Sequence, residues 1–335
     1  MSLGSISRSL SSWLRSLGTL ASTGPELARL ADSLGLDWRR WSRRRTGSAR
    51  DEVDVAALLD RARAAREARR TDEAITLYRE ALGRDRSHVA ALRGLREVAV
   101  AARRWSVALE AQERLVGVVP AAERGGEFAW LAVVHYERGR EELGADRASA
   151  ALAEFKQALR ADRQFVPAAV ALGDVLDAAG DTREAMRVWE RAAEATPSLP
   201  LLARLERVYR QEGRPSRMIA LYRGASERAP DDLGLAAALG RVYFELEMLD
   251  EAADQFEKLD VRAPDLPVIH AFLGAIFERR GDTREAFDEY RRALRLAHSF
   301  TWPHRCAACA ALAPSWEDRC RACGRWNTLR PADGR

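Results

Sequence analysis

The sequence lacks the features that mark membrane-spanning and exported proteins. Its apolar runs, such as Leu235–Leu239, fall far short of the ~20 residues that cross a bilayer. No apolar segment with a cleavage site follows the first residues, so a cleaved secretory signal is not expected. Charged residues make up 31% and hydrophobic residues 47% of the 335 residues, a balance that predicts a soluble, folded chain.

Lysine is nearly absent, occurring only at Lys156 and Lys258, and arginine takes its place. The net charge of +4 arises at one end of the chain. Residues 1–50 hold nine arginines against three acidic residues, whereas the other 285 residues carry 45 basic and 47 acidic groups. Because a nucleic-acid-binding protein needs a basic face along its folded body, this distribution argues against a nucleic-acid partner.

Catalytic motifs are absent as well. The sequence has no G-x-G-x-x-G, phosphate-binding loop or H-E-x-x-H pattern. Its five histidines, at positions 88, 135, 270, 298 and 304, do not cluster. We therefore predict that the protein is not an enzyme.

What the sequence does contain is an internal repeat. An Ala-x3-aromatic-x2-small pattern opens at positions 74, 108, 151, 185, 218, 252 and 286, with spacings of 34, 43, 34, 33, 34 and 34 residues. This period, with two apolar stripes, describes a helix–turn–helix unit that buries its faces only against stacked neighbours. Glycines of the first helices, at Gly173, Gly240 and Gly274, would let the second helices approach closely. Asp181 and Thr182 are expected to cap a second helix.

The pattern resembles the tetratricopeptide repeat family over residues 54–298, with about seven repeats, which implies an all-α superhelical solenoid. The 43-residue spacing adds about nine residues near Gly125–Arg147, as longer helices or a longer turn. Charged residues on the first helices are expected to line a concave, partner-binding groove: Arg93, Asp174, Asp177, Arg207, Arg210, Arg241 and Glu245. Their mixed signs favour a peptide or helix of mixed charge. The alternative is an ordinary solvated face.

The four cysteines form two pairs, Cys306–Cys309 and Cys320–Cys323, separated by ten residues. Two C-x2-C turns can offer four thiolates to one zinc or iron ion in a tetrahedral site, whereas a disulfide framework is typical of small secreted chains. Residues 300–331 are few for a domain that folds without a metal or disulfides. His304 is expected to be a bystander. We expect part of the tryptophan surface of this segment to dock on the last repeat.

Repeats followed by this cysteine spacing, and then by Trp326-Asn-Thr-Leu-Arg-Pro331, resemble the lipopolysaccharide assembly protein B family. That family joins tetratricopeptide repeats to a C-terminal rubredoxin-like, zinc-ribbon metal knuckle. The resemblance covers residues 54–331. It implies a cytoplasmic, non-enzymatic adaptor at the inner membrane that couples a membrane-anchored protease to the deacetylase of the lipid A pathway. The alternative is a generic cytoplasmic repeat scaffold or co-chaperone whose metal knuckle is purely structural.

The first 50 residues depart from that family, whose members begin with a transmembrane helix. Here an apolar stripe, including Leu10, Trp13 and Leu17, precedes the basic run Arg43-Arg44-Arg45. An amphipathic segment over residues 1–45 could lie on an anionic membrane surface in place of the anchor. The alternatives are a helix packed on the first repeat and a disordered leader.

Overall fold

The computed structural model describes residues 54–296 and 303–332. The expected leader, residues 1–50, lies outside the described residues. The chain divides into two compact units, Met1–Val98 and Ala99–Arg335. Among the described helices, none has both the length and the apolar character that a bilayer crossing requires.

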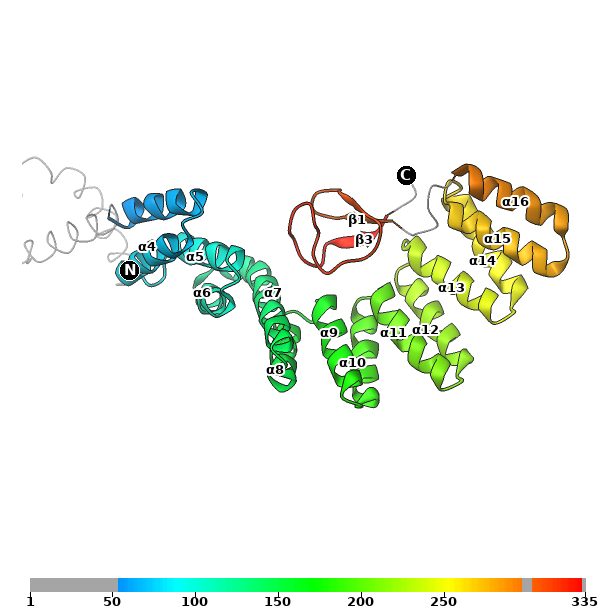
Figure 1. Cartoon of the computed structure of the whole chain (residues 1–335), viewed down its shortest axis with the longest axis horizontal. Coiled ribbons are helices and arrows are strands. Elements are labelled where there is room, and N and C mark those ends of the chain that lie inside the picture. Colours follow the sequence, from blue (N-terminus) through cyan, green and yellow to red (C-terminus); the bar gives the residue numbers. More distant parts are fainter. Residues whose placement is uncertain (1–53, 297–302, 333–335) are drawn as a thin grey trace, which may run out of the picture. The chain divides into compact units, whose positions relative to one another are not determined.

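The repeat region is entirely helical (Figure 1). A helix over residues 54–67 is followed by α4 (Thr71–Arg84), α5 (Val89–Ala101), α6 (Trp105–Val118), α7 (Ala121–Gly144), α8 (Ala148–Ala161), α9 (Val166–Ala178), α10 (Thr182–Ala195), α11 (Leu199–Gln211), α12 (Pro215–Arg228), α13 (Leu233–Glu245), α14 (Leu249–Arg262), α15 (Pro267–Arg280) and α16 (Thr283–Leu296). In chain order these described helices make seven pairs, one for each predicted repeat.

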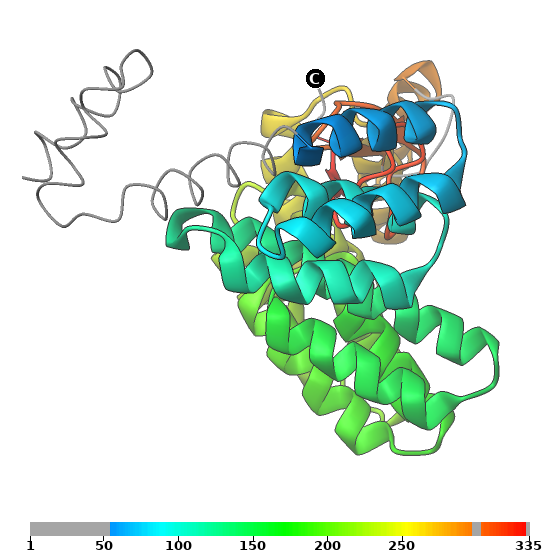
Figure 2. The ribbon, with the colours of Figure 1, turned by 90° about the vertical axis from the view of Figure 1, so that its left-hand side faces the viewer.

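Stacking follows the scheme of a solenoid. In the second unit each second helix contacts the first helix of the next pair, as α8 does with α9 and α14 does with α15. Within this second unit, Figure 2 shows successive helices lying one against the next. Each pair therefore buries its apolar face against its neighbours, which confirms the predicted repeat architecture.

The long spacing in the third repeat is explained by one long helix. α7 has 24 residues, whereas α9, the first helix of the next repeat, has 13. Aligned on Gly139 and Gly173, the two helices end at equivalent positions, so the additional residues lie in the N-terminal part of α7. A longer helix, rather than a longer turn, accounts for the spacing.

Glycines of the first helices lie directly under aromatic rings of the second helices. A Cβ placed on Gly240 would come within 2.8 Å of the Phe256 ring, and one on Gly173 within 2.0 Å of Trp189. Gly274 has the same relation to Tyr290. The sequence predicted this close approach, because glycine lacks the atom that would hold the ring away.

We expect Gly240→Ala to lower the free energy of unfolding by about 1–3 kcal/mol, since the added methyl group overpacks the Phe256 ring. Gly117→Ala on α6 is the matched control. Nothing lies within 4 Å of a Cβ at Gly117, so the higher helix propensity of alanine should stabilise α6 by up to about 1 kcal/mol. Urea denaturation followed by circular dichroism measures both. A loss of stability in the control equal to that of Gly240→Ala would contradict this account.

The expected capping of α10 by side chains is wrong. Neither Asp181 nor Thr182 makes a side-chain cap hydrogen bond at this helix. The backbone carbonyl of Asp181 already accepts from the N–H groups of Glu184 and Ala185, each at 3.0 Å. The Thr182 hydroxyl donates instead to Asp177 Oδ1 at 2.9 Å. In α13, by contrast, Asp232 Oδ1 accepts from the Leu235 N–H at 3.0 Å and caps the helix.

A small β domain follows the repeats. Strands β1 (His304–Cys306), β2 (Leu312–Ala313) and β3 (Leu329–Pro331) form an antiparallel sheet in the order β2-β1-β3. Its buried centre consists of Cys306, Cys320 and Leu329. With so small an apolar core, this domain needs a further source of stability.

Candidate metal centre and repeat groove

Each cysteine pair lies in a tight turn of the same design. The N–H of Ala310 donates to the carbonyl of Cys306 at 2.9 Å, and the N–H of Gly324 donates to that of Cys320 at 2.8 Å. Both donors follow the second cysteine of their pair, and both have positive φ, 58° and 70°. The left-handed residue bends the chain back, so the two thiols of each pair point to the same side.

The two turns bring all four sulfur atoms together. Every pair of Sγ atoms lies within 4.8 Å, with Cys306 and Cys323 at 3.7 Å and Cys309 and Cys320 at 3.8 Å. Zinc–thiolate bonds of about 2.3 Å in a tetrahedron place neighbouring sulfurs about 3.8 Å apart. A disulfide needs only about 2.05 Å, and all four thiols are free. The arrangement therefore fits one tetrahedral metal ion.

Two of the thiols differ in acidity. The Thr328 hydroxyl, 3.2 Å from Cys306 Sγ, and the backbone N–H of Ala308 lower the pKa of Cys306 to about 6. For Cys309, the N–H of Ala311 lowers the pKa, but desolvation and the neighbouring thiols outweigh this and raise it to about 12. A metal ion must displace the remaining protons, so binding would release protons.

The metal domain packs on α7. Tyr136 Oη and Arg140 Nη1 donate to Asp318 Oδ2 at 2.8 and 3.0 Å. The indole N–H of Trp326 donates to Glu137, and both residues are buried. These contacts pair a buried carboxylate with a buried indole donor, as burial of polar groups requires.

Apolar contacts accompany the polar ones. The ring of Trp326 meets Trp130 edge to face, with centroids 6.0 Å apart, and Arg319 stacks on its other side at 4.3 Å. Farther along, Pro331 lies against Gly234 at the start of α13. Trp130 belongs to the additional N-terminal turns of α7, so the long helix provides part of the surface on which the metal domain rests.

The expected docking on the last repeat is therefore wrong. In the described part of the chain, the metal domain contacts α7 and the beginnings of α11 and α13. The reason is chemical: α7 offers the acceptor that the Trp326 indole needs and the donors that Asp318 needs.

The predicted groove residues take part in ion pairs between neighbouring repeats. Asp174 of α9 pairs with Arg204 of α11, through two contacts of 2.5 and 2.6 Å. Asp177 pairs with Arg207 at 2.7 Å. One turn farther along α11, Arg210 pairs with Glu245 of α13. The first helices are thus linked by a ladder of charges, and the fields of opposite charges largely cancel.

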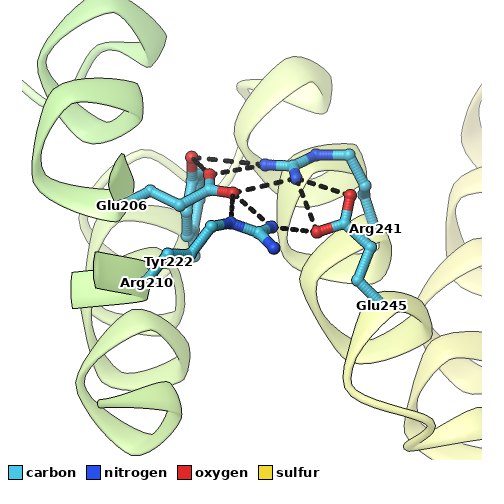
Figure 3. Close-up of polar contacts among 5 residues, drawn as sticks. All are labelled: Glu206, Arg210, Tyr222, Arg241 and Glu245. Carbon is cyan, nitrogen blue, oxygen red and sulfur yellow. Dashed lines mark hydrogen bonds and ion pairs between the residues drawn. The ribbon is translucent and has the colours of Figure 1, made fainter. Parts of the chain in front are cut away.

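Glu206 is the centre of this ladder (Figure 3). The carboxylate is buried and accepts hydrogen bonds from Arg241, Arg210 and Tyr222. Burial alone would raise the pKa of Glu206, but these donors outweigh it and lower the pKa to about 2. Glu206 and Arg241 therefore form an ion pair between α11 and α13 in which the carboxylate is buried and the Arg241 side chain is 30% exposed, whereas the Arg207 side chain is 49% exposed.

A cavity of about 490 Å³ opens beside these residues, lined by Ala203, Glu206, Arg207, Arg210, Gln211 and Arg241. It brings three of the predicted groove residues together, and Glu245 adjoins it through Arg210. Arg93 lies in the other unit, half-buried on α5. Sequence reasoning missed Glu206 and the docking residues Tyr136, Glu137 and Asp318. For Glu206, the one signal available in the sequence was an acidic side chain at a helical position that is otherwise apolar.

Comparison with protein families agrees with the geometry. Residues 304–331 match the LapB zinc ribbon, described as a rubredoxin metal binding domain. Residues 59–124, 136–200 and 201–236 match tetratricopeptide repeats. A search of curated proteins returns no significant match.

Several solved structures are similar to part of this chain. YrrB, a tetratricopeptide repeat protein with an unusual peptide-binding site, is 20% identical, with 49% of this chain and 86% of that chain covered and a TM-score of 0.36. MamA of Desulfovibrio magneticus RS-1 is 20% identical over 49% of this chain and 94% of that chain, with a TM-score of 0.37. MamA of AMB-1 is 23% identical over 50% and 98%, with a TM-score of 0.35. These similarities span about half of this chain and leave its function open.

The fold and the cysteine site together define a tetratricopeptide repeat protein with a C-terminal rubredoxin-like metal-binding domain. This combination matches the description of the lipopolysaccharide assembly protein B-like family.

Proposed function

We propose that the protein is a non-enzymatic adaptor that holds client proteins on its repeats and on its docked metal domain. Cys306, Cys309, Cys320 and Cys323 would bind one zinc or iron ion, whose role is to fold that domain. The observation that carries the proposal is the packing of the metal domain on the first helices of the repeats. Leu199 and Pro200, at the beginning of α11, line its contact with the metal domain, whereas Arg207 and Gln211 of the same helix line the open cavity. A client could therefore contact both along a single helix.

The resemblance to the lipopolysaccharide assembly family supplies the finer proposal. The client would be the deacetylase of the lipid A pathway, presented to a membrane-anchored protease at the cytoplasmic face of the inner membrane. Residues 1–45 would add contact with anionic lipid through their arginines. The protein would then control the rate at which a pathway enzyme is degraded, without chemistry of its own.

The test is capture of crosslinked partners by the full-length protein, identified by mass spectrometry. Ala203→Arg should reduce capture because it fills the cavity without removing any ion pair. Ala220→Arg is the matched control, since Ala220 is equally exposed but lies on α12, away from the cavity. Recovery of general chaperones alone, equally with both variants, would favour the generic scaffold.

A further inference from the structure

The last repeat exposes a surface that every other repeat covers. Two positions of each second helix, one and eight residues after the opening residue of the pattern, face the following repeat. They are Ile75 and Leu82, Leu109 and Val116, Leu152 and Leu159, Met186 and Ala193, Ile219 and Ser226, and Ala253 and Asp260, all buried or half-buried. In α16 the same positions hold Phe287 and Leu294, which are 60% and 70% exposed.

The reason for this difference is that none of the described helices covers α16. The second helices α6, α8, α10, α12 and α14 each contact the first helix of the next repeat. Within the described residues no helix follows α16, and the metal domain packs on α7 instead. Large apolar side chains at such a position are costly to leave in water.

The charges of α16 indicate what covers this face. Asp288 lies in its N-terminal half and Arg295 in its C-terminal half, and both are exposed. If two α16 helices pack antiparallel, with Phe287 opposite Leu294 of the other copy, each Asp288 lies beside Arg295 of the other copy. The face is thus complementary to itself in both apolar and charged groups. The basic leader of residues 1–50 is a poor occupant, because α16 carries four arginines against three acidic residues and so has no negative net charge to attract it.

We propose that α16 is a self-association surface, on which a second copy of this chain docks through its own α16. The contact is isologous: Phe287 packs against Leu294 of the second copy, and Asp288 pairs with Arg295 of the second copy. A single helix pair buries less than the ~800 Å² per partner of a typical stable interface, so the dimer forms reversibly and depends on protein concentration. A dimer presents two metal domains and two sets of repeats, which favours clients bound at two points.

Sedimentation of the full-length protein over a range of concentrations tests this proposal. The wild type should shift from monomer to dimer, and Phe287→Ser should raise the dissociation constant by about tenfold or more. Val261→Ser is the matched control, because Val261 is 86% exposed on α14, outside this face, and this variant should dimerise as the wild type does. A wild type that stays monomeric, or a dimer indifferent to Phe287→Ser, overturns the proposal.

A charge exchange tests the antiparallel pairing and does not depend on weakened folding. Asp288→Arg and Arg295→Asp should each weaken self-association, because each places like charges side by side in its own dimer. A mixture of the two variants should restore dimers, since every contact between unlike copies then pairs opposite charges. If the mixture associates no better than either variant alone, the proposed pairing is wrong.

Discussion

Cys320→Ser should release the metal ion and unfold the metal domain while the repeats stay helical. Three thiolates and a hydroxyl hold zinc or iron poorly, and metal binding contributes on the order of 10–16 kcal/mol to the folding of comparable small domains. The repeats depend mainly on contacts with their neighbours, so their helicity should persist. Elemental analysis should fall from about one ion per chain to near zero. Trypsin should then cut at Arg305, Arg319 and Arg325, which lie in the domain.

Ala322→Ser is the matched control, because it introduces the same hydroxyl between Cys320 and Cys323 at an exposed position. This variant should keep its metal and its protease resistance. Loss of the domain should also remove the partners of Tyr136 and Glu137, so amide hydrogen exchange in α7 should rise in Cys320→Ser only. A wild type with less than about 0.2 metal ions per chain, after reducing and metal-replete purification, would contradict the metal centre.

Arg241→Ala should lower the free energy of unfolding by about 1.5–3 kcal/mol, because it removes a charged hydrogen-bond partner and leaves the buried Glu206 with Arg210 and Tyr222 only. Arg207→Ala is the matched control. Its guanidinium is half-exposed and pairs with Asp177 alone, so about 1 kcal/mol or less should be lost. Combining Arg241→Ala with Glu206→Gln should recover part of the loss, since the buried charge that has lost Arg241 is then removed as well. Urea denaturation measures these free energies. Equal losses in Arg241→Ala and Arg207→Ala would contradict the conclusion that the contact of Arg241 with Glu206 is the more stabilising one.

The same carboxylate predicts a pH dependence. The pKa of Glu206 is about 2 in the folded protein, against an ordinary value of 4.5. The contribution of Glu206 to stability is therefore complete above about pH 4.5 and is lost as the pH falls toward 2. A shift of this size corresponds to about 3 kcal/mol. Between pH 4.5 and 2, the free energy of unfolding of Glu206→Gln should therefore fall by about 3 kcal/mol less than that of the wild type. The same pH dependence of unfolding in both proteins would contradict this role of Glu206.

These contacts change how the repeat surface can be probed. Reversing the charges of Arg207, Arg210 and Arg241 would affect more than client binding. Arg241 is half-buried and pairs with the buried Glu206, so its reversal would disturb the stacking of α11 on α13. Filling the cavity at Ala203 leaves the ion pairs in place and is the cleaner test.

Much of the fold could be predicted from the sequence because its determinants are local. The 34-residue period predicts the repeats, and the glycine–aromatic relation recurs in four of the seven described helix pairs. The C-x2-C spacing brings the thiols of each cysteine pair together. His270 of α15 is a packing histidine. It is fully buried, with Nδ1 2.7 Å from Glu289 Oε2 and Nε2 2.7 Å from the carbonyl of Pro264.

The docking of the metal domain could not be predicted, because it joins residues that are far apart in the chain. Trp326 and Glu137 are 189 residues apart in sequence, and Tyr136 and Asp318 are 182 apart. No sequence periodicity indicates that residues so far apart in the chain are in contact. The length of α7 was visible as an irregular spacing, but the spacing alone gives no reason to connect it with the cysteines.

The half-life of the lipid A pathway deacetylase in cells tests the adaptor most directly. We expect depletion of this protein to change that half-life, and the full-length chain to restore it. Cys320→Ser and Ala203→Arg should restore it poorly, whereas Ala322→Ser and Ala220→Arg should restore it fully. An unchanged half-life on depletion would contradict the proposed role of the protein in controlling proteolysis.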